Sequence, residues 1–194
     1  MIRTVLLTAI VLALSVGGGA GSVWYILNGT RGVGAVQVGS WTAFPDFGTP
    51  QADPYSRARF ARQGGLSLGK AEGIGFVAER DRDGRLLRRD CDYRVEGRMP
   101  AARYWTIYAG DDNNVVLPAL HRRVPALSSA ELIRESDGRL VVTIGRHAAP
   151  GNWLGVTGVG PMRFMLTLYD TQLSGALNAG EIDLPVISRI SCDV

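Results

Sequence analysis

The sequence predicts a mainly β protein in which a short helix precedes an antiparallel sandwich or barrel. Short runs of apolar and β-branched residues follow one another after residue 73. Tight-turn signals, Asp83-Gly84 and Asp137-Gly138 among them, separate these runs. Glycine fills 25 of the 194 positions, well above the usual share of about 7%. Short strands joined by tight turns favour an antiparallel arrangement over a parallel sheet.

The first segment of the chain predicts a single transmembrane helix within residues 1–30. No charged residue lies between Arg3 and Arg31, and the run VLLTAIVLALSVGGGAGSVWYIL occupies residues 5–27. At a rise of about 1.5 Å per residue, such a helix crosses a hydrocarbon core of about 30 Å. Trp24 falls near its far end, where amphipathic aromatic side chains favour the interface.

A cleaved signal peptide is the alternative interpretation of this segment. Val5–Val16 would be its apolar region and Ala20-Gly21-Ser22 its small-residue cleavage site. Cleavage there would leave a chain that starts with VWYIL and continues the apolar run, so the sequence favours an uncleaved anchor. Either interpretation places the body on the exported side. Arg3 favours a cytoplasmic amino terminus.

Two segments precede the predicted strands. Residues 31–49 are glycine-rich and aperiodic, which indicates a linker that becomes ordered around Trp41 and Phe44. A helix is predicted next, in ADPYSRARFARQGG, because Asp53 is a good N-cap and Pro54 suits the first helical position. Tyr55, Ala58, Ala61 and Arg62 would share its packed face, and Gly64-Gly65 would end it.

The predicted strands fill the rest of the body, residues 50–194. Two extended runs in IGFVAERDRDGRLLRRDCDYRVEG meet at Asp83-Gly84, a strong hairpin signal. A second strand pair is expected in ARYWTIYAGDDNNVVLP, and a third in AELIRESDGRLVVTIGR around Asp137-Gly138. The segments GPMRFMLTLYD and DLPVISRISC supply two further strands.

Composition and motif searches argue against several functional classes. A formal charge of +3 is small and scattered, so nucleic-acid binding is not expected. The two histidines, His121 and His147, have no acidic or cysteine partner at ligand spacing, so neither a metal site nor a cofactor is predicted. The glycines match neither a phosphate loop nor a dinucleotide fingerprint, and the serines sit in no nucleophile elbow.

Carboxylates are the remaining candidates for acid–base chemistry. They cluster at Asp90 and Asp92, on either side of a cysteine, and at Asp111 and Asp112. The first pair would lie on one face of a strand. The second pair sits where aspartate is favoured by turn geometry alone. We therefore expect turn and surface roles for these residues.

The two cysteines, Cys91 and Cys192, lack a CxxC spacing, so a zinc or redox motif is not indicated. In an oxidising compartment they favour one disulfide, which would close a loop of about a hundred residues and typically contribute about 2–4 kcal/mol. Two buried free thiols are the alternative.

The stretch GNWLG places Asn152 and Trp153 between glycines. The asparagine can bind loop backbone groups while the tryptophan covers one end of a core, so we expect a packing role. With Tyr104, Trp105 and Arg146, these residues could instead form a floor that binds a glycan or a lipid. No catalytic residue is predicted.

Several motifs in order resemble the DUF1214 family of bacterial envelope proteins, in its membrane-anchored single-domain form. They are ADPYSRARFARQGGLSLGKAEGIGF, CDYRVEG, ARYWTIYAGDD, DGRLVVTIGRHAAPGNWLGV, GPMRFMLTLYDT and LPVISRISC, over roughly residues 50–192. The resemblance implies a β-sandwich of jelly-roll type. It also strengthens the expected Cys91–Cys192 disulfide, because both positions match the family. In the family loop, proline usually follows Asn-Trp-Leu, whereas this chain has Gly155, so a less rigid loop is expected.

The resemblance implies no activity but does imply a partner, because DUF1254 proteins accompany this domain in one longer chain or as a separate one. We therefore expect an inner-membrane protein with a single span and a periplasmic domain. Its expected function is that of a non-catalytic interaction module for a DUF1254-type protein. A glycan- or lipid-binding domain is the second expectation. A hydrolase that uses Asp90, Asp92 or Asp111 is the third.

Overall fold

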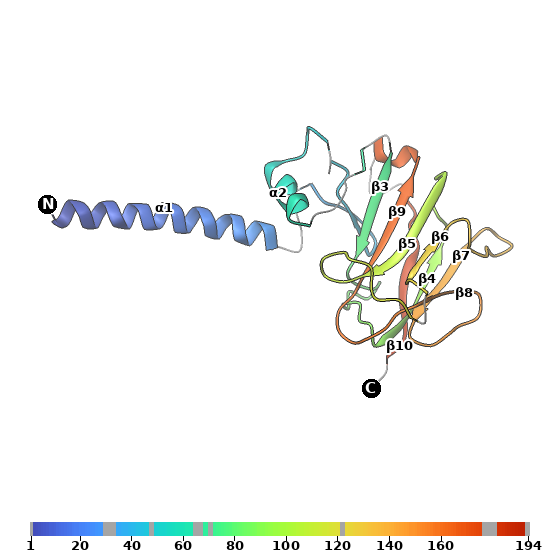
Figure 1. Cartoon of the computed structure of the whole chain (residues 1–194). Helices are drawn as coiled ribbons and strands as arrows, with labels where there is room; N and C mark the ends of the chain where they lie inside the picture. Colours follow the sequence, from blue (N-terminus) through green and yellow to red (C-terminus); the bar gives the residue numbers. More distant parts are fainter. Residues whose placement is uncertain are drawn as a thin grey trace.

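The computed structural model describes residues 2–28, 34–46, 49–63, 68–69, 72–120, 123–175 and 182–192. Helix α1 (Ile2–Asn28) stands away from a body built of two β-sheets, and helix α2 (Pro54–Gln63) lies between α1 and the sheets (Figure 1). A short 3₁₀ helix, η1 (Gln172–Gly175), follows the ninth strand. The described part of the chain is mainly β, as the sequence predicts.

The larger sheet has six strands, and each of its pairs is antiparallel. In spatial order its strands are β1 (Val36–Val38), β2 (Trp41–Ala43), β3 (Gly73–Ala78), β9 (Arg163–Tyr169), β5 (Tyr104–Gly110) and β6 (Ala126–Ser128).

The smaller sheet has four strands in the order β10 (Val186–Cys192), β4 (Cys91–Gly97), β7 (Leu140–Gly145) and β8 (Asn152–Gly155). Its first two pairs are antiparallel, but β7 and β8 run parallel, which differs from the predicted all-antiparallel arrangement. Parallel neighbours usually need a connection of a dozen residues or more. The six-residue connection 146–151 is long enough here because it has to run back along only four paired residues of β7, Val142 to Gly145.

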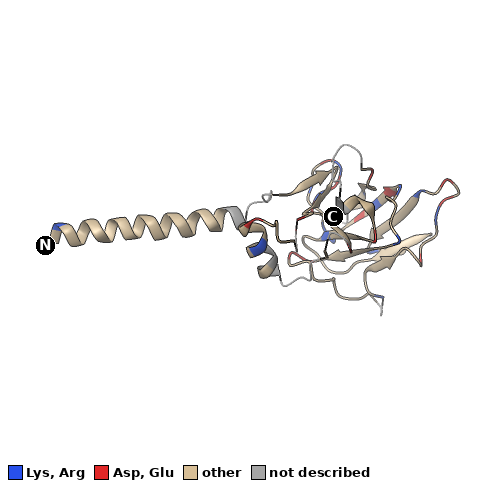
Figure 2. Ribbon diagram, turned by 90° about the horizontal axis from the view of Figure 1, so that it is seen from above, with Lys and Arg blue, Asp and Glu red and all other residues tan. Residues whose placement is uncertain are grey.

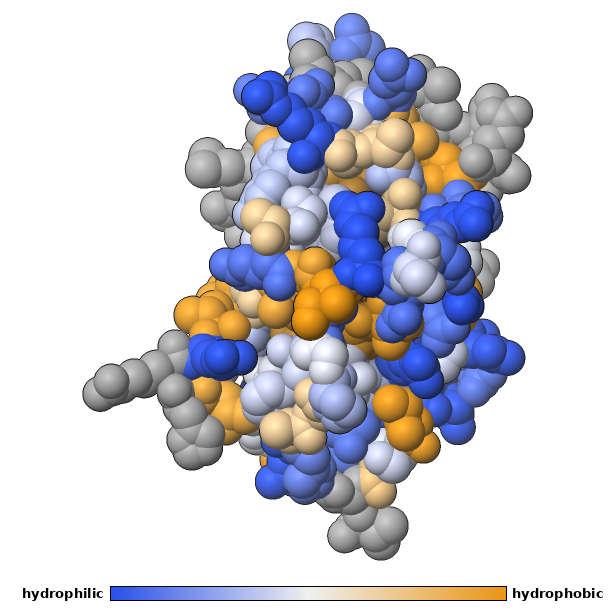
Figure 3. All heavy atoms as spheres, turned by 90° about the vertical axis from the view of Figure 1, so that its right-hand side faces the viewer, coloured by the Kyte–Doolittle hydropathy of each residue, from blue (hydrophilic) through white to orange (hydrophobic). Residues whose placement is uncertain are grey.

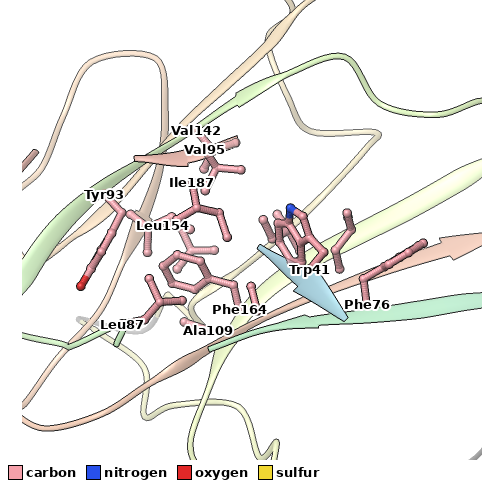
Figure 4. Packing of buried hydrophobic residues seen from close by; sticks show 14 of the residues in the cluster. Trp41, Phe76, Leu87, Tyr93, Val95, Ala109, Val142, Leu154, Phe164 and Ile187 are labelled. Atoms are coloured by element: carbon pink, nitrogen blue, oxygen red, sulfur yellow. The ribbon is translucent and has the colours of Figure 1, made fainter. Parts of the chain in front are cut away.

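Side chains from both sheets form a single hydrophobic core between them. Phe164 of β9 meets Tyr93 of β4 edge to face, with ring centroids 5.7 Å apart. Trp41 and Phe76 of the larger sheet extend the same cluster, and Leu154 joins it from β8 (Figure 4). Each such side chain contributes about 1.5–3 kcal/mol when it is fully buried.

A hairpin of β1 and β2 lies within residues 31–49, where the sequence predicts a linker. Trp41 is only 1% exposed, and its indole N–H donates to the carbonyl of Pro185 (2.7 Å). Gly39 turns the chain between the two strands with a φ of 58°. Each strand is three residues long, which is too short for an alternating pattern to stand out in the sequence.

Helix α2 begins as predicted. The Asp53 carboxylate accepts the backbone N–H groups of Tyr55 (2.9 Å) and Ser56 (3.0 Å), which is the N-cap geometry. Hydrogen bonds from Ser56 lower the pKa of Asp53. The buried side differs from the expected one, because Ser56 is buried whereas Ala58 and Ala61 are exposed. Gly64-Gly65 and the Arg62 side chain lie outside the described residues.

The Asp-Gly turns form where the sequence predicts them, but they do not join paired strands. Asp83-Gly84 turns between the isolated bridge partners Arg80 and Leu86, while the flanking β3 and β4 belong to different sheets. Asp137-Gly138 turns just before β7, and no strand of the described chain precedes it in that segment. Turn chemistry is local, whereas the sheet that a strand joins depends on distant residues.

Cys91 and Cys192 form a disulfide that joins residues 101 positions apart. The two cysteines face each other in the register of β4 and β10. The bond therefore holds the last strand of the body against the middle of the smaller sheet.

Helix α1 is the one helix among the described residues that is apolar and long enough to cross a membrane, over Ile2–Tyr25. The mean hydropathy of this stretch is 1.9, and none of it is buried against the body. Viewed from above, its charge is confined to the end near Arg3 (Figure 2).

Candidate functional site

Tyr104 and Trp105, two of the five predicted site residues, lie on the larger sheet and on opposite faces of β5. Trp105 is 3% exposed and belongs to the core. Its backbone pairs with Ser129, whose amide donates to the Trp105 carbonyl (2.9 Å). Tyr104 points away from the core and lies beside Tyr169, with ring centroids 5.8 Å apart. The structure therefore does not bring these two residues onto one surface.

Asn152, Trp153 and Arg146 lie on the smaller sheet, where Arg146 follows the end of β7 and the other two belong to β8. Strand β8 is an edge strand, and its Leu154 faces the core. These three residues define the β7–β8 edge, which is the candidate site described below. Tyr104 and Trp105 are not part of it.

Asn152 ties a neighbouring segment to the β7–β8 edge. Its Oδ1 accepts the backbone N–H of Ile133 (2.8 Å), while its Nδ2 donates to the carbonyls of Ile133 (2.7 Å) and Val141 (2.9 Å). The side-chain amide thus pairs with Ile133 as a neighbouring strand would. It covers part of a sheet edge that would otherwise be open to pairing with another chain.

Trp153 lies on the outer side of β8, since the alternate residue Leu154 points inward. A Cβ at Gly155 would come within 2.8 Å of the indole ring and within 2.9 Å of Leu120. The ring and the Leu120 side chain therefore lie directly against the backbone of Gly155, and any larger residue at this position would displace them. Buried indole N–H groups usually find an acceptor, yet the buried Nε1 of Trp153 has none among the described residues.

Asp92 lies on β4, the strand next to β7, and its carboxylate reaches the β7–β8 edge at Gly145. Its Oδ1 accepts the backbone N–H of Arg146 (3.2 Å), and its Oδ2 accepts the hydroxyl of Ser191 (3.2 Å). The His147 ring lies 3.8 Å from the same Oδ2 and is itself 71% exposed. A Cβ at Gly145 would clash with the carboxylate, so Asp92 lies directly on the β7 backbone.

The carboxylate and the indole lie close together on this face. Gly145, beneath Asp92, pairs with Gly155, beneath Trp153, and neighbouring strands are about 4.8 Å apart. The β7–β8 edge therefore presents an aromatic ring and a carboxylate over a floor of two glycines. That combination can bind a ligand that has both apolar and hydroxyl groups.

Two of the other predicted carboxylates, Asp90 and Asp111, accept hydrogen bonds within their own segments. Asp90 accepts three hydrogen bonds from the Arg88 guanidinium, from Nε to Oδ1 (3.0 Å) and Oδ2 (3.1 Å) and from Nη2 to Oδ2 (2.9 Å). Arg88 accordingly lowers the pKa of Asp90. Asp111 accepts the N–H groups of Asn113 and Val115 within its own turn. His121 lies outside the described residues, and those residues contain no cluster of potential metal ligands.

The body also contains a buried ion pair that no local sequence pattern indicates. The Asp81 side chain has no exposed surface, and its Oδ2 lies 3.2 Å from Nε of Arg189 and 3.3 Å from Nε of Arg85. The Arg189 guanidinium also lies over the Tyr93 ring, 5.4 Å from its centroid, and donates to the carbonyl of Leu86 (2.6 Å). Asp81 falls two residues before the Asp83-Gly84 turn, where aspartate is common for backbone reasons alone, so the local pattern does not reveal the ion pair.

One side of the body carries an apolar surface. Strands β6, β7 and β8 lie on the side opposite α1 (Figure 1). Seen from that side, apolar side chains form a band between hydrophilic areas (Figure 3). Val124, next to β6, and Ile133, bound to Asn152 of β8, are both exposed.

Comparison with known proteins identifies the class to which this two-sheet body belongs. Residues 72–173 match a family described as "Protein of unknown function (DUF1214)". The match covers more than half of the chain, and the chain therefore belongs to the DUF1214 family. No curated protein matches it.

Two solved structures resemble the body. The VPA0106 protein from Vibrio parahaemolyticus is 20% identical with a TM-score of 0.58, over 73% of this chain and 36% of that one. A putative uncharacterized protein from Burkholderia cenocepacia is 16% identical with a TM-score of 0.41, over 65% of this chain and 31% of that one. The chain thus spans about a third of the length of each, and the Vibrio structure supports the fold alone.

Proposed function

We propose that the chain is a membrane-tethered, non-catalytic interaction module whose β body lies in the periplasm and binds a DUF1254-type partner. The observation that carries this proposal is helix α1, which is apolar over Ile2–Tyr25 and has no surface buried against the body. A soluble helix with that composition would normally be buried in a core. A bilayer gives α1 the apolar surroundings that its own body does not provide.

A feature of the body also supports its proposed location in the periplasm. The Cys91–Cys192 disulfide is the kind of bond that persists in oxidising compartments such as the bacterial periplasm. The two sheets packed on one core are compatible with the jelly-roll type of sandwich that the family resemblance implies, and we adopt that type as part of the proposal.

A partner is supported by the relation between this chain and its larger fold neighbour. The matched fold occupies 36% of the Vibrio chain, so most of that chain lies outside it. We propose that, for this chain, a separate DUF1254-type protein takes the place of such an additional segment. The apolar band on the β6–β8 side is the surface proposed to receive it, because exposed Val124 and Ile133 gain from burial in a contact.

The test is purification of the full-length protein from its native membrane in mild detergent, with mass spectrometry of the proteins that co-elute. Ile133→Glu places a charge in the proposed contact, whereas Val159→Glu makes the same change at an equally exposed valine in a separate loop; these side chains are 69% and 72% exposed. We expect a stoichiometric DUF1254-type partner with the wild type and with V159E, and its loss with I133E. A wild-type chain that elutes without any such partner would contradict the proposal.

Binding of a glycan or lipid at the β7–β8 edge is a second candidate function. The buried Nε1 of Trp153 favours it, because this N–H has no acceptor among the described residues and a ligand hydroxyl or carbonyl would supply one. A thermal-shift screen of envelope glycan fragments and lipids tests it. Trp153→Phe keeps an aromatic ring but removes the N–H, so it should abolish any shift seen with the wild type. An equal shift in both proteins would exclude binding at Nε1.

A further inference from the structure

We propose that helix α2 is a basic membrane-surface contact that binds the phosphate groups of anionic lipids beside the point where α1 leaves the bilayer. This inference rests on the proposed membrane anchor. It adds a second contact with the membrane, made by the body itself, so that α1 would not be the sole tether.

The first step is the position of α2 relative to the end of α1. A Cβ at Gly34 would lie 3.8 Å from Oδ2 of Asp53 and 4.0 Å from Oγ of Ser56, so the start of α2 lies against Gly34. Gly34 follows Asn28, the last residue of α1, by only six positions. Six extended residues span at most about 22 Å. The first turn of α2 therefore stays within about 22 Å of the end of α1, which keeps it on the side of the body that faces the proposed bilayer.

The second step is charge. Helix α2 contains Arg57, Arg59 and Arg62 and no acidic residue. Between α1 and the end of α2, residues 29–63 contain four arginines and two aspartates, a balance of +2. One of those aspartates is Asp53, whose carboxylate already caps the helix. Figure 2 shows the basic residues of α2 beside the end of α1 that meets the body.

The third step is the chemistry of the exposed surface of α2. Arg57 is exposed, and its Nη2 donates to the carbonyl of Pro50, which uses one of its five N–H donors. Guanidinium groups bind phosphate oxygens in a bidentate manner. The neighbouring Ala58 and Ala61 are exposed and small, so the helix can approach a flat surface closely. Basic segments next to a membrane span are attracted to anionic headgroups.

The experiment uses the full-length chain inserted into vesicles of phosphatidylcholine alone, or of phosphatidylcholine mixed with phosphatidylglycerol. Hydrogen exchange of the α2 amides is measured in both. We expect exchange in the anionic vesicles to be slower by about fivefold or more, and the difference to disappear at high salt. The variant R57Q/R59Q/R62Q should exchange alike in both vesicle types.

A control variant, R82Q/R94Q/R134Q, removes the same charge from exposed positions elsewhere on the body and should keep the wild-type difference. Equal exchange of wild-type α2 in the two vesicle types would overturn the proposal, as would loss of the difference in the control variant. Alkaline extraction of the same samples separates this failure from failure of the anchor. Release of the chain from both vesicle types would contradict the anchor itself, and the lipid contact with it.

Discussion

At the scale of single residues, polar side chains hold separate segments of the body together by hydrogen bonds. Asn152 pairs with backbone groups of Ile133 and Val141, and Asp92 pairs with Arg146 and Ser191. Each of these side chains links segments that are distant in the sequence. Their removal leaves backbone or hydroxyl groups without a partner, which costs more than the bond itself contributes.

Asn152→Ala tests this role. The substitution removes three hydrogen bonds at the β7–β8 edge, so we expect the free energy of unfolding to fall by about 1–3 kcal/mol. Asn113→Ala removes the same amide from an exposed turn, where a loss below about 0.5 kcal/mol is expected. Urea unfolding of both variants provides the measurement, and equal losses would show that the contacts of Asn152 are not important for stability.

Asp81→Asn tests the buried ion pair. The change leaves the Arg189 guanidinium, whose side chain is 15% exposed, without its charged partner. Breaking a buried pair from one side costs about 3–5 kcal/mol, and we expect a value toward the lower end because Arg85 remains half-exposed nearby. Asp83→Asn, whose carboxylate is itself half-exposed, should cost less than about 1 kcal/mol. Similar losses for the two variants in urea unfolding would contradict this account.

Asp90 gives a pH-dependent prediction. Arg88 lowers the pKa of Asp90 below its ordinary value of 3.8. A carboxyl group whose pKa is lower in the folded state stabilises the protein above its unfolded pKa, and this contribution is lost as the pH falls through the folded pKa. The stability difference between wild type and Asp90→Asn should therefore shrink below about pH 4. A difference that stays constant across that range in urea titrations would show that the Arg88 contact does not couple to folding.

The carboxylate and the tryptophan of the β7–β8 edge show how far the sequence could predict the candidate site. Asn152, Trp153 and Arg146 stand close together in the sequence, and the structure keeps them together. Trp105 shares only its aromatic character with them, and the alternation of β5 turns it into the core. Asp92 comes to Trp153 only through the pairing of Gly145 with Gly155, which no local pattern reveals.

At the scale of elements, the disulfide and strand β10 act together. The last strand pairs with β4 alone within its sheet, and Cys192 bonds to the residue that faces it. Arg189 adds the buried contact with Asp81 from the same strand. A strand at the edge of a sheet has half the pairing of a central one, so a covalent bond matters most there.

The double variant Cys91→Ser/Cys192→Ser should lose about 2–5 kcal/mol of stability. Hydrogen exchange should rise first in β10, because that strand would then depend on β4, Asp81 and a few core contacts. Wild-type protein treated with a thiol reductant should give the same pattern, and the untreated wild type is the control. Uniform exchange across all strands after reduction would show that the bond stabilises the whole body rather than β10.

Some elements could be predicted from the sequence and some could not, for physical reasons. Helix α2, β9 and β10 have local signals, namely an N-cap or clear alternation, and they form where expected. The β1–β2 hairpin has three-residue strands, and its place depends on the pairing of β2 with β3. The parallel pairing of β7 with β8 depends on a connection that folds back over four residues. The first is decided by a distant contact and the second by the path of a six-residue connection, and neither leaves a local pattern in the sequence.

At the scale of the whole molecule, the chain consists of one exposed apolar helix and one compact body. The β6–β8 side of the body, with its apolar band, lies away from α1 (Figures 1 and 3). If α1 lies in a bilayer, that side points away from the membrane, and α2 stays near its surface. In this arrangement, the proposed partner and the proposed lipid contact occupy opposite ends and do not compete.

The most direct test of the central claim, a tethered and exported body, is the intact mass of the chain recovered from native membranes after alkaline washing. We predict a membrane-retained chain that still contains residues 1–22 and is two hydrogens lighter than the reduced form, because Cys91 and Cys192 are bonded. A washed-off chain that begins after Ser22, or one with two free thiols, would contradict the claim.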